Sequence, residues 1–115
     1  ELFLETNLIK KKEICNSLFK KSKKKIFGYG AGAKGQHLIH LFDLGDKIYK
    51  IFDNTKEFHH SYVPSTKIEI IPPGTLDLEK LYIFNLAPTH HEAIRENCKN
   101  CNRFFDIIND ELNCL

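Results

Sequence analysis

The residues whose types and spacing point most clearly to a ligand site lie in a glycine-rich run at positions 28–33, Gly-Tyr-Gly-Ala-Gly-Ala. This run satisfies the pattern G-x-G-x-x-G/A, which is typical of loops that hold a phosphate between a strand and a helix. We expect Gly28 to permit the sharp turn and Gly30 to let the backbone approach a phosphate. We expect Ala33 to let the following helix pack closely on the sheet.

Two charged residues fit a ligand in the same place. The exposed N–H groups at the start of a helix attract an anion, and Lys34 adds a full positive charge in the first turn. Asp53 lies about 20 residues beyond Ala33, where an acidic side chain can accept a hydrogen bond from a ribose hydroxyl. The loop therefore predicts a nucleotide-type ligand without specifying which one, and a tight turn with no ligand is the alternative.

Apolar segments and turn-forming residues divide the rest of the chain into the elements that would position this loop. Helices are expected at 5–21, 33–44, 75–80 and from 89 to about 98. Strands are expected at 26–30, 48–52, 67–71, 81–84 and 103–108. The last helix begins with Thr89 and Glu92 at the spacing of a capping box, and residues 55–66 form an irregular loop with one helical turn.

Strands that alternate with helices predict a mostly parallel sheet with right-handed crossovers. The expected fold class is therefore α/β: a Rossmann-like three-layer α/β/α sandwich with about five strands, preceded by an N-terminal helix. We divide the chain into an N-terminal helix with a basic connector at 1–25 and a Rossmann-like nucleotide(-sugar)-binding domain at 26–115.

Composition and charge exclude several classes of protein. The 115 residues are 42% hydrophobic and 28% charged, which is ordinary for one soluble domain. Because no apolar run reaches the roughly 20 residues of a membrane helix and the start does not resemble a signal peptide, we expect a cytoplasmic protein without a membrane partner. Residues 1–25 carry a net charge of +5 and the remainder −3, which is unlike a nucleic-acid-binding protein. The chain contains no Met, so we expect it to be part of a larger enzyme.

The octet at residues 28–35, Gly-Tyr-Gly-Ala-Gly-Ala-Lys-Gly, resembles the G-Y-G-A-x-A-K-G loop of the C-terminal domain of sugar C-methyltransferases. These enzymes use S-adenosylmethionine to methylate a carbon of a nucleotide-linked keto-sugar. The resemblance covers most of residues 20–108 and continues through Asp53-Asn54, Lys56, Pro64, Ile68–Ile71, Pro72 and Tyr82-Ile83-Phe84-Asn85.

The resemblance implies a Rossmann-like domain that helps to enclose the nucleotide-sugar, for which dTDP is one candidate nucleotide. It also implies that S-adenosylmethionine and the general base belong to a separate methyltransferase domain, so that this chain binds no cofactor and is not active alone. Residues 28–35 and Asp53 are then substrate-side residues, and no catalytic residue is assigned to this chain.

Histidines and cysteines supply the remaining candidates. His90 and His91 begin the helix after the fourth strand, at the edge of the sheet where α/β folds bind ligands. His90 is therefore a candidate contact to a phosphate or sugar, and a solvated first helical turn is the alternative. Cys98 and Cys101 form a CxxC pair at the C-terminal end of a helix, where the helix dipole does not activate a thiol, so we expect a structural role and no metal site.

The predicted ligand-binding residues lie in the loop, at the ends of the second and fourth strands, and at the start of the last helix. They are Gly28, Tyr29, Gly30, Ala31, Gly32, Ala33, Lys34, Gly35, Asp53, Asn54, Asn85 and His90. Besides the C-methyltransferase module, two hypotheses stay open. One is an NAD(H)- or nucleotide-binding Rossmann domain of another sugar-nucleotide-modifying enzyme or sensor, and the other is a structural module whose loop is vacant.

Overall fold

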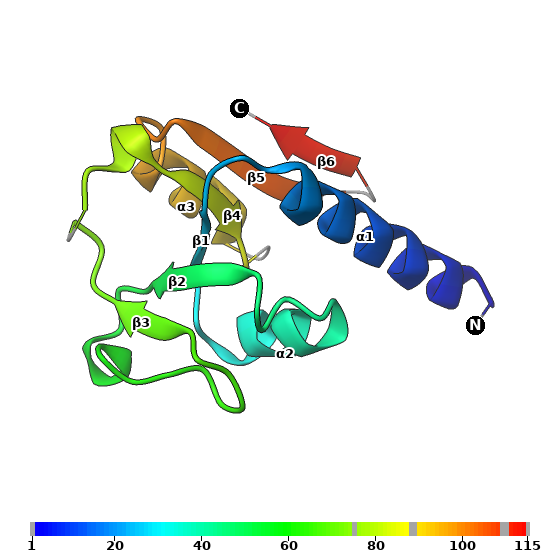
Figure 1. The fold of residues 1–115 in the computed structure, drawn as a ribbon, viewed down its shortest axis with the longest axis horizontal. Helices are drawn as coiled ribbons and strands as arrows, with labels where there is room; N and C mark the ends of the chain where they lie inside the picture. Colours follow the sequence, from blue (N-terminus) through cyan, green and yellow to red (C-terminus); the bar gives the residue numbers. More distant parts are fainter. Residues whose placement is uncertain (1, 75, 88–89, 109–110, 115) are drawn as a thin grey trace.

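The computed structural model describes residues 2–74, 76–87, 90–108 and 111–114 of the chain. Three α-helices, two short 3-10 helices and six strands occupy these residues (Figure 1). In chain order they are α1 (Leu2–Lys21), β1 (Ile26–Tyr29), α2 (Ala33–Leu41), β2 (Ile48–Phe52), η1 (Lys56–Phe58), β3 (Glu69–Ile71), η2 (Leu78–Lys80), β4 (Tyr82–Asn85), α3 (His91–Asn97), β5 (Arg103–Ile108) and β6 (Glu111–Cys114).

The strands form one sheet in the order β3-β2-β1-β4-β5-β6. The first five strands run parallel, whereas β6 pairs antiparallel with β5. The α/β, Rossmann-like class and the mostly parallel sheet are thus confirmed, with the expected N-terminal helix first. The sequence did not predict β6, because its four residues, Glu-Leu-Asn-Cys, contain no β-branched or aromatic side chain that would mark a strand.

Alternate residues of each central strand point to opposite faces, as strand geometry requires. Ile26 and Phe84 lie in the core on one face, and their neighbours Phe27 and Ile83 lie in the core on the other. All four side chains are at most 5% exposed, so β1 and β4 are buried on both faces. This explains why the strands read as continuous apolar runs in the sequence.

The first core is covered by α1 and α2. Cys15 of α1 is fully buried there, and Leu18 and Phe19 pack beside it. The ring of Phe19 lies 5.7 Å from that of Phe84, centroid to centroid, which joins α1 to β4. From α2, Ile39 is fully buried in the same core. The helix α1 therefore packs on the sheet, while the boundary expected after residue 25 stays a prediction.

The second core is covered by α3, through Ile94 and Cys98. Leu78 of η2 packs against it as well, because the connection from β3 to β4 contains no α-helix. Helices on both faces complete the expected three layers (Figure 1). Among the described residues, no helix combines the length and apolar character that crossing a membrane requires.

Several boundaries differ from those expected. The helix predicted at 33–44 ends at Leu41, where Asp43 with a φ of 56° begins the turn toward β2. The strand predicted from residue 67 begins at Glu69, and the helix predicted at 75–80 is reduced to η2. Thr89 of the predicted capping box lies outside the described residues. His90 occupies the N-cap of α3, and no side-chain capping bond is found there within the described part of the chain.

Candidate functional site

The order of the sheet reverses between β1 and β4, which place their carboxyl ends side by side. Tyr29 at the end of β1 pairs with Asn85 at the end of β4. Crevices at such a reversal are where open α/β sheets bind ligands, because the loops leaving the two strands turn to opposite faces. The glycine-rich loop follows β1 here, so the fold puts the predicted motif at the expected edge.

The sharp turn of this loop is made by Gly30, which has a φ of 109°. A Cβ at this position would lie 2.9 Å from the Cβ of Ala87, so both backbone conformation and space require glycine. The predicted role of Gly28 in the turn is wrong, because Gly28 lies within β1. Its missing side chain leaves room for Leu86, whose Cδ1 would be 2.6 Å from a Cβ at Gly28.

Close packing of the helix on the loop is provided by Gly35, and the prediction that Ala33 has this role is wrong. Ala33 is exposed, whereas Gly35 is buried. A Cβ at Gly35 would overlap the backbone oxygen of Gly30, so α2 can approach the end of β1 only with glycine there. Gly35 lies two residues after Ala33, so the residue that close packing requires falls outside the pattern G-x-G-x-x-G/A.

Asp53 fixes the shape of the loop. Its Oδ2 accepts a hydrogen bond from the backbone N–H of Ala31 at 2.7 Å, and its Oδ1 accepts one from Thr55 at 2.8 Å. From the other side, the Nε2 of Gln36 donates to the carbonyl oxygen of Ala31 at 2.9 Å. A carboxylate that accepts from backbone amides makes strong, charge-assisted bonds, so Asp53 holds the loop in place whether or not it also meets a ribose.

The start of α2 presents unsatisfied N–H groups at this edge. Gly32 is the N-cap residue and has an extended backbone, and no described side chain forms a capping bond with the helix. The amide of Gln36 donates to the carbonyl oxygen of Gly32, which leaves the amides of residues 33–35 to meet solvent or a ligand. A Cβ at Gly32 would find no described atom within 4 Å, and Lys34 is exposed beside it. These features make the start of α2 an exposed, positively polarised surface that favours an anion.

Asn85 adds a buried polar group at the same edge. The residue is 4% exposed, and its Oδ1 accepts a hydrogen bond from the N–H of Ala87 at 2.8 Å. Its Nδ2 is buried without a hydrogen-bond partner among the described residues. A buried donor without a partner costs about 1–3 kcal/mol, so this atom is a reason to expect a ligand acceptor here.

His90 lies on the same connection from β4. Its backbone N–H donates to the carbonyl oxygen of Ala87 at 2.9 Å, and its side chain is exposed. The predicted contact between His90 and a phosphate or sugar stays a prediction. The structure therefore places the loop, Asp53, Asn54, Asn85 and the backbone of His90 at one edge of the sheet.

A cavity that the sequence did not predict opens beside Tyr29. The hydroxyl of Tyr29 donates to Oδ1 of Asn54 at 3.2 Å. Burial raises the pKa of Tyr29. A cavity of about 360 Å³ lies next to this hydroxyl and is lined by Tyr29, Phe52, Asn54, Pro73, Gly74, Leu78 and Asn97. Asn97, Pro73 and Gly74 carry no motif, so sequence reasoning could find them only through their place at the ends of α3 and β3.

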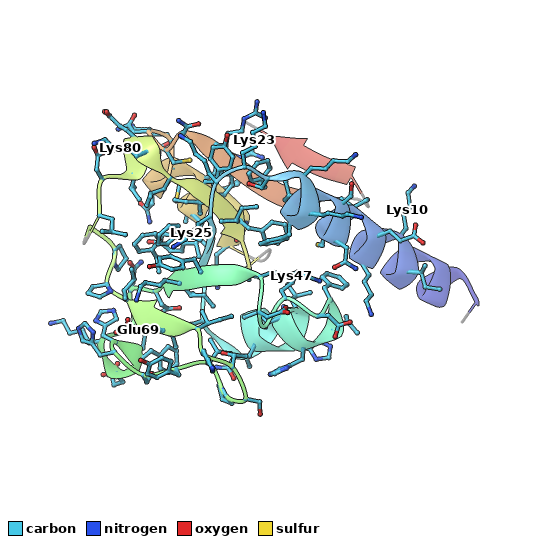
Figure 2. All side chains as sticks on the ribbon, viewed as in Figure 1. Lys10, Lys23, Lys25, Lys47, Glu69 and Lys80 are labelled. Carbon is cyan, nitrogen blue, oxygen red and sulfur yellow. The ribbon has the colours of Figure 1, made fainter. Side chains whose placement is uncertain are left out.

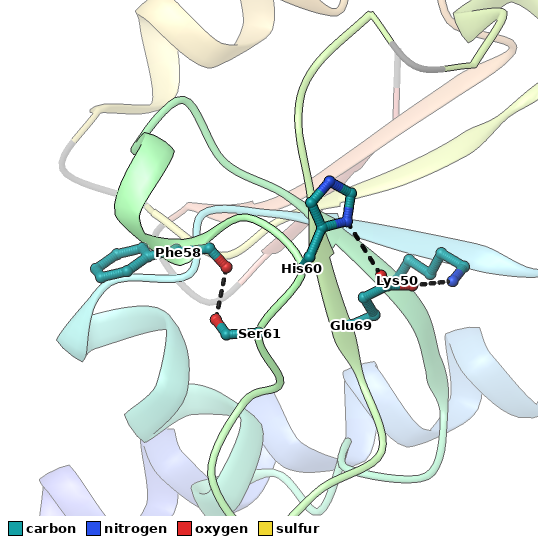
Figure 3. Close-up of polar contacts among 5 residues, drawn as sticks. All are labelled: Lys50, Phe58, His60, Ser61 and Glu69. Carbon is teal, nitrogen blue, oxygen red and sulfur yellow. Dashed lines mark hydrogen bonds and ion pairs between the residues drawn. The ribbon is translucent and has the colours of Figure 1, made fainter.

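The two histidines of the second crossover have different partners. Nε2 of His59 lies 2.6 Å from the backbone carbonyl oxygen of Asp53, next to the glycine-rich loop. Figure 3 shows that His60 faces Glu69, whose carboxylate also meets Lys50. The distances are 3.4 Å from Nδ1 of His60 and 2.6 Å from Nζ of Lys50. The hydrogen bond from Lys50, followed by that from His60, lowers the pKa of Glu69. These residues form a surface cluster that ties β2 to β3.

The CxxC pair is placed for packing. Cys98 is 1% exposed, and burial raises the pKa of its thiol to about 12. Such a thiol stays protonated at neutral pH and is a poor nucleophile and metal ligand. Cys15, on the opposite face of the sheet, also has a pKa raised to about 12 by burial. Neither thiol belongs to the site.

Comparisons with known proteins agree with the architecture. No curated protein sequence matches the chain. Among solved structures, UDP-D-quinovosamine 4-dehydrogenase from Vibrio fischeri superposes with a TM-score of 0.56 at 20% sequence identity. The alignment covers 82% of this chain and 94% of that one, and at this identity the likeness shows a shared fold alone.

The sequence family is shown by a different comparison. The family model of the C-methyltransferase C-terminal domain matches residues 7–104, a range that contains the glycine-rich loop, Asp53, Asn85 and the cavity residues. This match confirms the resemblance drawn from the octet at 28–35. The chain belongs to the family of C-methyltransferase C-terminal domains.

Proposed function

We propose that this chain is the substrate-binding module of an S-adenosylmethionine-dependent C-methyltransferase that acts on a nucleotide-linked keto-sugar. The observation that carries the proposal is the accessible start of α2, where Gly32 leaves open space and no described side chain caps the helix. We assign this helix start to the diphosphate of the substrate, because backbone amides there favour negative charge.

Lys34 and Asn85 support the same assignment. Lys34 is exposed in the first turn of α2, where its ammonium group can approach a phosphate oxygen. Nδ2 of Asn85, which has no hydrogen-bond partner among the described residues, supplies a donor from the neighbouring strand. Asp53 already accepts from two amides, but a carboxylate has about four acceptor positions, so it can also accept from a ribose hydroxyl.

The methyl donor and the catalytic base belong, on this proposal, to a methyltransferase domain outside the chain. S-adenosylmethionine supplies the methyl group there, and the present chain orients the sugar nucleotide. We propose a cytoplasmic setting and dTDP or UDP as the nucleotide.

Isothermal titration with dTDP, UDP and NAD tests the proposal. We expect the nucleoside diphosphates to bind and Lys34→Ala to weaken them about 5- to 10-fold, which is the value of one exposed charge-assisted contact. Lys80→Ala is the matched control, because Lys80 precedes β4 and so lies toward the opposite, amino edge of the sheet (Figure 2). Equal affinities for the two variants, or binding of NAD in place of the diphosphates, would contradict the proposed function.

A further inference from the structure

A groove runs along α1 on the face of the sheet that α1 and α2 cover. Its volume is about 840 Å³, and it is lined by one side of α1, the connection to β1 and the starts of β4 and β5. Tyr82 begins β4 and Arg103 begins β5, so the groove lies toward the amino edge of the parallel strands. The candidate ligand site lies at the opposite, carboxyl edge, so an occupant of the groove is independent of the proposed function.

The floor of the groove is apolar. Ile14 and Leu18 lie about one turn apart on α1, and both side chains are only partly buried. Tyr82 and Phe105 come from the neighbouring strands β4 and β5, and their rings meet edge to face with centroids 5.9 Å apart. Because burial of apolar surface is the main favourable contribution to association, this floor favours a partner that presents apolar side chains to it.

The rim of the groove is basic. Among the described lining residues, Lys10, Lys21, Lys23 and Arg103 face the single acidic side chain of Glu13, which gives a net charge of +3. The three lysines are exposed, and none of them forms an ion pair with a described residue. Lys10 and Lys23 mark the two ends of the groove (Figure 2). This charge repels a second copy that presents the same rim and attracts an acidic partner.

The length of the groove suits a helix. From Lys10 to Lys21 it follows about three turns of α1, or about 16 Å at the rise of an α-helix. Lys10, Ile14 and Leu18 form a row at intervals of four residues, and the side chains of a second helix pack into the grooves beside such a row. An amphipathic helix occupies an apolar groove in this way, with anchors at i, i+3, i+4 and i+7.

We propose that this groove docks an acidic amphipathic helix of a protein partner. Its apolar side chains lie over Ile14, Leu18 and Tyr82, and its carboxylates lie beside Lys21 and Lys23. Because the groove is at the amino edge of the sheet, the docked helix leaves the loop at residues 28–35 accessible. The partner and a ligand at the start of α2 can therefore be bound at the same time.

Fluorescence anisotropy with two labelled synthetic peptides tests the proposal. One peptide carries leucine at i, i+3, i+4 and i+7 with glutamate at the flanking positions, and the second carries lysine in place of each glutamate. We expect the chain to bind the glutamate peptide about 10-fold or more tightly than the lysine peptide at about 0.15 M salt, where exposed charges more than about 8 Å apart are largely screened.

Two matched pairs of variants locate the binding. Lys21→Glu should weaken the glutamate peptide about 5- to 10-fold, whereas Lys20→Glu, at the neighbouring exposed lysine outside the lining, should change its affinity less than about 2-fold. Ile14→Ala removes part of the floor and should weaken the peptide about 3- to 10-fold. Ile9→Ala, at a side chain that is 59% exposed and outside the lining, should change little. Because Lys21 is exposed, the first pair decides the question even where Ile14→Ala destabilises the chain.

Several outcomes overturn the proposal. They are no binding of the glutamate peptide, equal affinity for the two peptides, and equal effects of Lys21→Glu and Lys20→Glu. A loss with Lys21→Glu but none with a folded Ile14→Ala variant leaves only attraction between surface charges and overturns it as well. Phosphatidylserine vesicles that displace the peptide would make a lipid surface the occupant. A dimer seen by sedimentation equilibrium and lost in Ile14→Ala would make it a second copy, and in either case the helical partner is wrong.

Discussion

Two glycines at the start of α2 should respond to the same substitution in opposite ways. Gly35→Ala places a methyl group against the backbone oxygen of Gly30, whereas Gly32→Ala places it where no described atom lies within 4 Å. Gly35 is the third residue of the helix after the N-cap Gly32, so intrinsic helix propensity alone would make alanine more stable there by about 1 kcal/mol. The tertiary contact must therefore overcome a local preference.

The expected loss at Gly35 follows from these two opposing effects. Overpacking of a filled interior costs about 1–3 kcal/mol, and the upper value applies because a backbone carbonyl cannot rotate away as a side chain can. Subtracting the gain in propensity leaves about 2 kcal/mol, or a melting temperature about 8 °C lower for a chain of this size. At Gly32, the N-cap preference for glycine over alanine and the lower entropy of the unfolded alanine variant nearly cancel, so we expect a change within about 2 °C.

Thermal unfolding followed by circular dichroism, without ligand, measures both variants against the wild type. The Gly32→Ala variant controls for the general effect of exchanging glycine for alanine in this segment. A Gly35→Ala variant that melts at or above the wild-type temperature would show that the gain in helix propensity exceeds the cost of the contact with the Gly30 oxygen. The close approach of α2 to the end of β1 would then be wrong.

Two further predictions concern carboxylates. Asp53→Ala removes two amide contacts of a half-buried carboxylate and should cost about 2–3 kcal/mol, or a fall of roughly 10 °C in melting temperature without ligand. Asp46→Ala, at an exposed position, should change the melting temperature little. Equal melting temperatures of the two variants would refute the role of Asp53 in holding the loop. Glu69 has a pKa lowered chiefly by Lys50, so its contribution to stability is present above its ordinary pKa of about 4.3 and is lost as the pH falls through the lowered value. Glu69→Gln should therefore lower the melting temperature slightly at about pH 7 and not below about pH 3, and an equal difference at both pH values would show that the charge is irrelevant.

The pattern of apolar runs was sufficient to predict the parallel strands, most clearly β1 and β4, which are buried on both faces and so contain few polar residues. The strand β2 begins and ends where expected, at Ile48 and Phe52. Short elements were less predictable, because pairing with a neighbour creates them. Thus β6 is a strand because it pairs antiparallel with β5. Residues 67 and 68, predicted to belong to β3, lie in the loop before it.

The sequence predicted which candidate residues lie together at the carboxyl edge of the sheet, but not what each of them contacts. A motif gives the position of a glycine, but only the neighbours decide what its missing side chain makes room for. Gly28 gives space to Leu86, which is 58 residues away, and Gly35 to the backbone oxygen of Gly30 on the other side of the turn. Asp53 reads as a ribose ligand from its spacing, yet its carboxylate holds Ala31.

Packing explains some residues of the loop and leaves others to a ligand. Gly30 and Gly35 are required by backbone conformation or close contact, so they would be needed even in a loop that binds nothing. A Cβ at Gly32 would meet no described atom within 4 Å, and Lys34 is exposed, so packing in the described structure requires neither residue type. Stability measurements on the first pair and binding measurements on the second therefore answer different questions. A vacant structural turn predicts effects at Gly30 and Gly35 alone, whereas an anion site at the start of α2 also predicts an effect at Lys34 that the melting temperature does not reveal.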